Sequence, residues 1–175
     1  MDKTDWSQFL QKDSRLPTDV VFKVIEDGTK EEEVEQKTAL VPAHKFLLSG
    51  VSTVFCALFF GELKSTTDQI DIKETTVEAF TAIINFIYKP TNLKSFTCPQ
   101  TLFQILNLSE RYQIDSLKES VTMALKVLTI SADSLMFTAK SAKNYEVFTD
   151  VSKMLTNRCG SFLKNQLIKQ LQRPQ

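Results

Sequence analysis

The chain has 175 residues, of which 42% are hydrophobic and 24% charged. This is ordinary globular composition, and the length suits one domain with its own core, with or without a small helical appendage. Lysine plus arginine and aspartate plus glutamate each number 21, so the formal net charge is zero. A neutral chain lacks the cationic surface that nucleic acid and anionic membranes attract, and we expect neither as a partner.

The three cysteines, Cys56, Cys98 and Cys159, are odd in number and widely spaced. No CxxC pair occurs, so the pattern indicates reduced thiols, and we expect Cys56 to be buried in an apolar helix. Residues 1–16 are polar with only scattered apolar residues, so we expect no signal peptide, and no run approaches the ~18 apolar residues of a membrane span. Reduced thiols are typical of cytoplasmic and nuclear proteins, which is the expected location.

The N-terminal segment carries Trp6, Phe9 and Leu10 among polar residues. This spacing suits a short amphipathic helix or a docked tail. Leu16-Pro17 ends the segment, because the residue before a proline avoids the helical region.

The β-strands are expected in the first half of the chain. Residues 20–25 are β-branched and aromatic and predict a strand, residues 30–36 predict a solvated, glutamate-rich loop or hairpin tip, and residues 38–41 predict the returning strand. QIDIK, at 69–73, alternates apolar and polar residues and predicts a third short strand.

Two helices are expected in VPAHKFLLSGVSTVFCALFF, at 41–60. Pro42 suits the beginning of the first, over 43–49, because a helix start does not need its missing N–H. Ser52 is a candidate N-cap for the second, which ends at Gly61. This stretch holds too many large apolar side chains for one helix to bury on one face. The excess favours a protein-binding module over an active site.

Helical spacing and candidate caps predict the remaining helices. They are expected at 76–88, 101–112, 115–128, 131–143, 146–157 and 161–171, with residues 92–96 as a short strand or loop. Strands in the first half and helices in the second indicate an α+β protein with a helical majority.

Little in the sequence favours catalysis. His44 is the one histidine, and it stands beside Lys45 where a helix is expected to begin, so we expect it to cap or hydrogen-bond; lining a binding groove is the alternative. A zinc site needs about four suitable ligands, which three scattered cysteines and one histidine do not supply. The four glycines form neither GxGxxG nor GxxxxGK[ST]. We therefore expect no enzyme activity, metal or cofactor.

Five segments, in order and at suitable spacing, resemble the BTB/POZ domain. They are LPTDVVF (16–22), VPAHKFLLSGVSTVFCALFFGEL (41–63), IDI (70–72), FTAIINFIY (80–88) and SERYQIDSLKE (109–119). The first helices resemble animal BTB domains that read VPAHK followed by S-x-V-F-x-A-hydrophobic-F-x-G. The resemblance implies an α+β BTB/POZ fold, a small β-sheet capped by a helical cluster, plus C-terminal helices.

The resemblance also implies a domain organisation. Residues 1–15 would be an N-terminal segment with a dimer contact, residues 16–128 the BTB/POZ domain, and residues 129–175 a helical extension similar to the family's 3-box and the start of its BACK region. No separate substrate-binding domain is recognised within these residues.

In function, the resemblance implies a homodimeric adaptor that binds the N-terminal domain of cullin-3 and links an unknown substrate protein to a ubiquitin ligase. The alternative is a BTB oligomerisation scaffold or transcriptional co-regulator that does not bind cullin. Phe60 favours this alternative, because adaptors often carry glutamate at that position; the helices after Leu128 favour the adaptor.

Three sets of residues carry over from the family by position. The cullin-binding set is Leu58, Phe60, Tyr112 and Ile114. The dimer set is Trp6, Phe9, Leu10, Phe46, Leu47 and Val51. The third set, Asp19 and Lys45, matches a buried charged pair beside the dimer groove.

Overall fold

The computed structural model describes residues 5–10, 16–26, 37–62, 64, 67–90, 93, 96–144 and 149–171. The predicted glutamate-rich loop over 30–36 lies outside these residues, as does most of the strand or loop over 92–96. The chain divides into two compact units, Met1–Thr91 with Gln104–Glu119, and Asn92–Phe103 with Ser120–Gln175. Each unit is described by itself.

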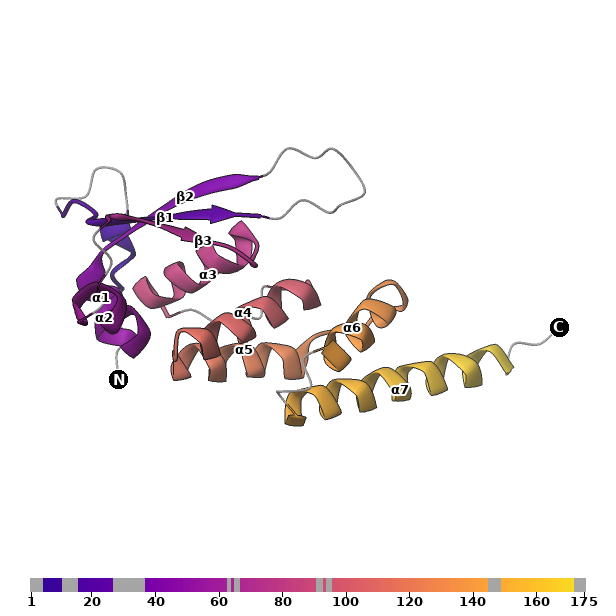
Figure 1. The fold of residues 1–175 in the computed structure, drawn as a ribbon. Helices are drawn as coiled ribbons and strands as arrows, with labels where there is room; N and C mark the ends of the chain where they lie inside the picture. The colour runs from indigo at the N-terminus through magenta and orange to yellow at the C-terminus, as the bar shows by residue number, and fades with distance from the viewer. Residues whose placement is uncertain are drawn as a thin grey trace. The chain divides into compact units, whose positions relative to one another are not determined.

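The first unit contains a three-stranded sheet in the order β2-β1-β3 (Figure 1). The central strand β1 (Val20–Ile25) pairs antiparallel with β2 (Thr38–Ala43) and parallel with β3 (Gln69–Ile72). The register places Phe22 beside Val41 on one side and Ile70 on the other. The three predicted strands are thus confirmed. In β3 the apolar side chains Ile70 and Ile72 are more buried than Gln69 and Asp71, because successive side chains of a strand point to opposite faces of the sheet.

The strand β2 is longer than the sequence indicated. It continues through Pro42 to Ala43, so Pro42 does not begin a helix as expected. Helix α1 starts later, at Lys45, and runs to Val51. An edge strand tolerates proline because its outward N–H has no sheet partner to lose. The preference of proline for the first turn of a helix was outweighed by the pairing of Pro42 with Val21 in the sheet.

Helix α2 (Thr53–Phe60) begins and ends at the predicted residues. The Phe55 N–H donates to Ser52 Oγ at 3.1 Å, which makes Ser52 the N-cap. Gly61 ends the helix. A Cβ at that position would lie 2.4 Å from the carbonyl oxygen of Ala57, so a glycine is required for this close approach.

Helix α3 (Val77–Tyr88) lies along the sheet and is the core helix of the first unit (Figure 1). The Ala79 N–H donates to Thr76 Oγ1 at 3.3 Å, which makes Thr76 the N-cap. The side chains buried along α3 are Ala79, Phe80, Ala82, Ile83, Ile84, Phe86, Ile87 and Tyr88. A helix that is apolar on most of its circumference must be covered on most sides.

Five aromatic side chains fill the space between the sheet, α2 and α3, and we call them the aromatic cluster. Its members are Phe22, Phe55, Phe59, Phe80 and Tyr112, all of them buried. Ring centroids lie 5.1 Å apart for Phe22 and Phe80, and 4.5 Å apart for Phe55 and Tyr112. Tilted and offset contacts at these distances add to the free energy of burying each ring.

Helices α4 (Pro99–Arg111) and α5 (Asp115–Val127) each contribute residues to both units. In the second unit, α6 (Ala132–Asn144) packs against α7 (Thr149–Leu171). The sequence predicted two helices, over 146–157 and 161–171, but the structure has one. Gly160 lies inside α7 with open space around it. A glycine within a helix costs about 1 kcal/mol relative to alanine, which does not suffice to break a helix whose buried residues Leu155 and Cys159 hold it in place.

Arg158 ties α7 to the end of α5. Its Nη1 donates to the carbonyl oxygens of Leu125 and Lys126, each at 3.0 Å, and its Nη2 donates to that of Leu128. The last carbonyls of a helix have no partner within the helix, so the guanidinium satisfies groups that would otherwise need water. None of the described helices is long and apolar enough to cross a bilayer.

Replacing Arg158, whose forked guanidinium makes these bonds, tests their contribution to stability. We expect Arg158→Ala to lower the free energy of unfolding by about 1.5–3 kcal/mol, because charge-assisted hydrogen bonds are lost. Arg158→Lys keeps the charge without the fork and should fall between the parent and Arg158→Ala. Urea unfolding followed by circular dichroism measures the difference. Equal stability of all three proteins would contradict a role for the fork.

Candidate functional site

His44 is buried and belongs to a hydrogen-bond network. Its backbone N–H donates to Tyr88 Oη at 2.8 Å, its Nδ1 lies 2.7 Å from the same hydroxyl, and its Nε2 lies 3.2 Å from the Leu16 carbonyl oxygen. A carbonyl only accepts, so Nε2 carries the proton and Nδ1 accepts from Tyr88. The expected hydrogen-bonding role is confirmed; no side-chain cap bond is formed.

Tyr88 is the centre of this network. Burial raises the pKa of Tyr88 to about 12, against the opposing hydrogen bond from His44 and with the nearby charge of Asp19 adding to the rise. The hydroxyl therefore stays protonated and can donate at neutral pH. The network secures the start of α1 to the end of α3.

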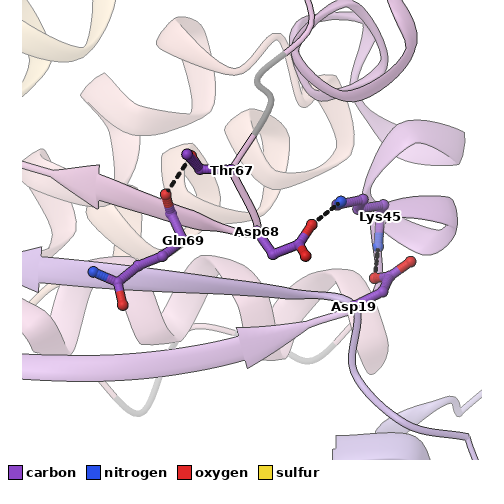
Figure 2. A network of polar contacts seen from close by, with 5 residues as sticks. All are labelled: Asp19, Lys45, Thr67, Asp68 and Gln69. Atoms are coloured by element: carbon purple, nitrogen blue, oxygen red, sulfur yellow. Dashed lines mark hydrogen bonds and ion pairs between the residues drawn. The ribbon is translucent and has the colours of Figure 1, made fainter.

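Asp19 and Lys45 meet, but not as the buried ion pair that the sequence predicted (Figure 2). The backbone N–H of Lys45 donates to Asp19 Oδ1 at 2.7 Å, while Lys45 Nζ lies 2.7 Å from Asp68 Oδ1. Asp19 thus satisfies an N–H in the first turn of α1, where His44 supplies no cap. The ammonium turns to Asp68 because that carboxylate lies just before β3, within its reach.

This network is also more exposed than predicted. Asp19 is exposed, and the side chains of Lys45 and Asp68 are 23% and 84% exposed. An exposed pair contributes about 0–1 kcal/mol, far less than the 3–5 kcal/mol at stake when a buried pair is broken. In this chain alone, the contact orders the surface around α1 more than it stabilises the core.

The predicted cullin-binding residues divide into buried and exposed side chains. Phe60 is 61% exposed and Leu58 is half-buried, whereas Tyr112 and Ile114 are 7% and 1% exposed. Burial raises the pKa of Tyr112, against the charge of Arg111, as expected for a hydroxyl inside the fold. Tyr112 and Ile114 therefore support the site from within, and a partner would not touch them in this conformation.

One side of α2 is exposed, and the sequence predicted only Phe60 of its four residues as part of a binding surface. Thr53, Cys56, Ala57 and Phe60 are all exposed, and their spacing of three, four and seven residues places them on one side of the helix. Cys56 was expected to be buried and is not. In a helix that is apolar nearly all round, residue type does not tell which side faces the core. We call these four residues the α2 face.

The α2 face is held beside the turn between α4 and α5. Ser52 Oγ donates to the Tyr112 carbonyl oxygen at 2.5 Å, and Thr53 Oγ1 donates to Gln113 Oε1. These residues lie 60 positions apart in the chain. The structure therefore brings together the two parts of the chain that hold the predicted cullin-binding residues, with Gln113 in place of Tyr112 as the exposed member.

The predicted dimer residues are partly accessible. Phe46, Val51 and Trp6 are 80%, 43% and 39% exposed, and Leu47, Phe9 and Leu10 are intermediate. Residues 7–10 form one turn of 3-10 helix, shorter than the helix the sequence suggested. Exposed aromatic side chains of this size favour contact with another protein.

The N-terminal segment docks on its own chain. The Trp6 N–H donates to the Tyr88 carbonyl oxygen at 2.7 Å, and Lys89 Nζ lies 2.8 Å from Asp5 Oδ2. The ring of Trp6 stacks on Phe9 with centroids 5.6 Å apart. Residues 5–10 thus form a docked tail, which is one of the two alternatives that the sequence predicted.

The second unit has an open hollow of about 500 Å³. Residues 127–130 line one side, and α7 residues including Arg158 and Phe162 line the other. The Arg158 guanidinium already bonds the carbonyl oxygens at the end of α5. Across the described ranges, no three histidine, cysteine or acidic side chains are grouped to hold a metal ion.

Comparison with known proteins decides the family. A model of the BTB/POZ domain matches residues 9–128. The chain belongs to the BTB/POZ family. BTB/POZ domain-containing protein 9 of Drosophila melanogaster is 23% identical over 155 residues, covering 88% of this chain and 22% of that protein. BTB/POZ domain-containing protein 3 of Homo sapiens is 30% identical over 135 residues, covering 74% and 23%.

Among solved structures, the BTB domain of zebrafish PATZ1 aligns with a TM-score of 0.45 and 19% identity, over 62% of this chain and 75% of that one. The chain spans less than a quarter of the length of the two curated relatives. Family membership confirms the predicted α+β BTB/POZ fold. BTB/POZ domains are non-enzymatic protein–protein interaction modules, so the chemistry to explain is binding.

Two substitutions separate the core of this site from its surface. We expect Tyr112→Ala to lower the free energy of unfolding by about 3 kcal/mol or more, because it opens a cavity against Phe55. Phe60→Ala removes a mostly exposed ring and should change it by less than about 0.5 kcal/mol. Thermal and urea unfolding measure both. A large loss in Phe60→Ala, or none in Tyr112→Ala, would reverse the assignment.

Proposed function

We propose that this chain is the BTB module of a cullin-3 ubiquitin-ligase adaptor, that it acts as a homodimer in the cytoplasm or nucleus, and that it performs no covalent chemistry itself. Residues 1–15 would add to the dimer contact, residues 16–128 would form the BTB/POZ domain, and residues 129–175 would form the 3-box and BACK-like extension. A further part of the protein would recruit the substrate.

The observation that carries the proposal is the α2 face beside the α4–α5 turn. Cys56 and Ala57 are small, so a partner helix can approach closely there, and Phe60 stands at the end of the stripe as an aromatic anchor. Helices bind to other proteins through anchors at this spacing. Exposed aromatic anchors contribute most of the energy in many interfaces.

Phe60 decides the chemistry that the partner must offer. Where adaptors often carry glutamate, this chain has an apolar ring, so a charge-assisted hydrogen bond is replaced by a hydrophobic contact. The proposal therefore requires an apolar side chain of cullin-3 opposite Phe60. The same residue supports the rival, a scaffold or transcriptional co-regulator that binds no cullin.

Titration calorimetry with the cullin-3 N-terminal domain tests the adaptor. We expect a Kd below about 10 μM for the parent chain, and a weakening of about tenfold or more for Phe60→Ala. Met123→Ala, at an exposed apolar position outside the proposed surface, is the matched control and should bind as the parent does. A folded dimer that does not bind would rule out the adaptor and leave the scaffold.

The homodimer rests on the dimer residues. Phe46 and Val51 project from α1, and Trp6 lies on the docked N-terminal segment; a second copy that covered these side chains would remove apolar surface from water. The zero net charge adds little repulsion between copies.

Light scattering after gel filtration tests the dimer. The parent should elute with twice the chain mass of 19.9 kDa. Phe46→Asp places a charge in the proposed interface and should shift the protein to the monomer, while Met123→Asp should leave it dimeric. A monomeric parent at micromolar concentration would contradict self-association.

A further inference from the structure

One of two left-handed backbone positions lies in the α4–α5 turn, and the other lies between β3 and α3. Among the described residues, Glu74 and Gln113 are the two non-glycine residues with a left-handed backbone, at φ 62° and 52°. Both side chains make contacts at this turn: Glu74 Oε2 accepts from Arg111 Nη2 at 2.9 Å, and Gln113 Oε1 accepts from Thr53. Such residues are uncommon, and they persist where the surroundings or a function require them.

The turn itself does not need the glutamine side chain. The Ile114 N–H donates to the Ser109 carbonyl oxygen at 2.8 Å, and the Gln113 N–H donates to that of Glu110 at 3.0 Å. This is the Schellman motif, in which the left-handed position is usually glycine. Glycine would make both backbone bonds with less strain, so the hydrogen bonds of the turn do not explain the glutamine.

The side chain of Gln113 has another partner, and that partner is on the α2 face. Its amide oxygen accepts from the hydroxyl of Thr53, the first residue of α2. Gln113 is exposed, as is Thr53, so the bond lies on the surface of the molecule and adds nothing to the core. The left-handed backbone at Gln113 accompanies a bond that links the turn to the first turn of α2.

We propose that Gln113 is a positioning residue for partner binding: through Thr53 it holds the α2 face at a set place beside the α4–α5 turn. The inference rests on the proposed function for the identity of the partner, and on the geometry alone for the fixing of α2. Ser52 anchors the same end of the helix through the Tyr112 carbonyl, so Gln113 limits the movement of a helix that is already attached.

Four variants of the 175-residue chain test the inference. Gln113→Gly and Thr53→Val each remove the side-chain bond, the double variant lacks that same single bond, and Met123→Ala, outside the α2 face, is the control. Each is measured for the melting temperature, the Kd for the cullin-3 N-terminal domain, and hydrogen exchange of the amides over residues 53–60.

We expect Gln113→Gly to melt at or above the parent temperature, because left-handed strain is relieved. It should nevertheless bind about three- to tenfold more weakly and exchange faster over α2. Thr53→Val should match it, the double variant should lose no more affinity than either single change, and Met123→Ala, which lies outside the α2 face, should behave as the parent. A merely structural role would lower the melting temperature and affinity together.

The outcomes separate this inference from the function on which it rests. If the parent binds and Gln113→Gly binds equally well, the positioning role is wrong while the adaptor stands. If the parent does not bind cullin-3, the adaptor fails, and exchange decides: faster exchange over residues 53–60 in Gln113→Gly upholds the fixing of α2, and unchanged exchange overturns it.

Discussion

The packing of the aromatic cluster is the interaction on which the first unit depends. Phe22 comes from the central strand, Phe55 and Phe59 from α2, Phe80 from α3, and Tyr112 from the end of α4. The five rings come from four separate segments of the chain. Burying them together therefore fixes the positions of the sheet, α2, α3 and the start of the α4–α5 turn relative to one another. Removing any one ring would leave its neighbours beside a cavity.

The binding surface follows from this cluster. Because Phe55 and Phe59 point inward, the other side of α2, with Cys56, Ala57 and Phe60, must face solvent. Because Tyr112 stacks on Phe55, the turn that follows lies next to α2. The core thus places an exposed stripe beside a turn, and the bonds of Ser52 and Thr53 hold that arrangement at the surface.

Polar contacts set the ends of the helices. Tyr88 and His44 join the end of α3 to the start of α1, Asp19 satisfies the first turn of α1, and Lys45 reaches Asp68 (Figure 2). In the second unit, Arg158 does the same for the end of α5. These groups serve helix termini, where backbone groups lack partners, and they explain why single charged and polar residues matter in a chain of zero net charge.

Much of the fold could be predicted from the sequence. β-Branched and aromatic composition identified β1, alternation identified β3, and helical spacing identified α3 and α5. Ser52 and Gly61 were found because a local hydrogen bond or close approach needs those residue types. The family, too, was evident from five short segments. Local signals failed where a neighbour distant in the chain decided the outcome: Pro42 joined a strand, and Gly160 stayed in a helix.

The sequence by itself determined that this is an α+β BTB/POZ chain with more apolar surface on residues 41–60 than one helix can bury. Only the tertiary structure decided which of those side chains face outward. Phe59 and Phe60 are the same residue type and adjacent, yet Phe59 is buried and Phe60 is exposed, and the neighbours Tyr112 and Gln113 differ in the same way. The physical reason is that burial depends on what packs against each side of a helix, which residue type and spacing do not specify when both sides are apolar.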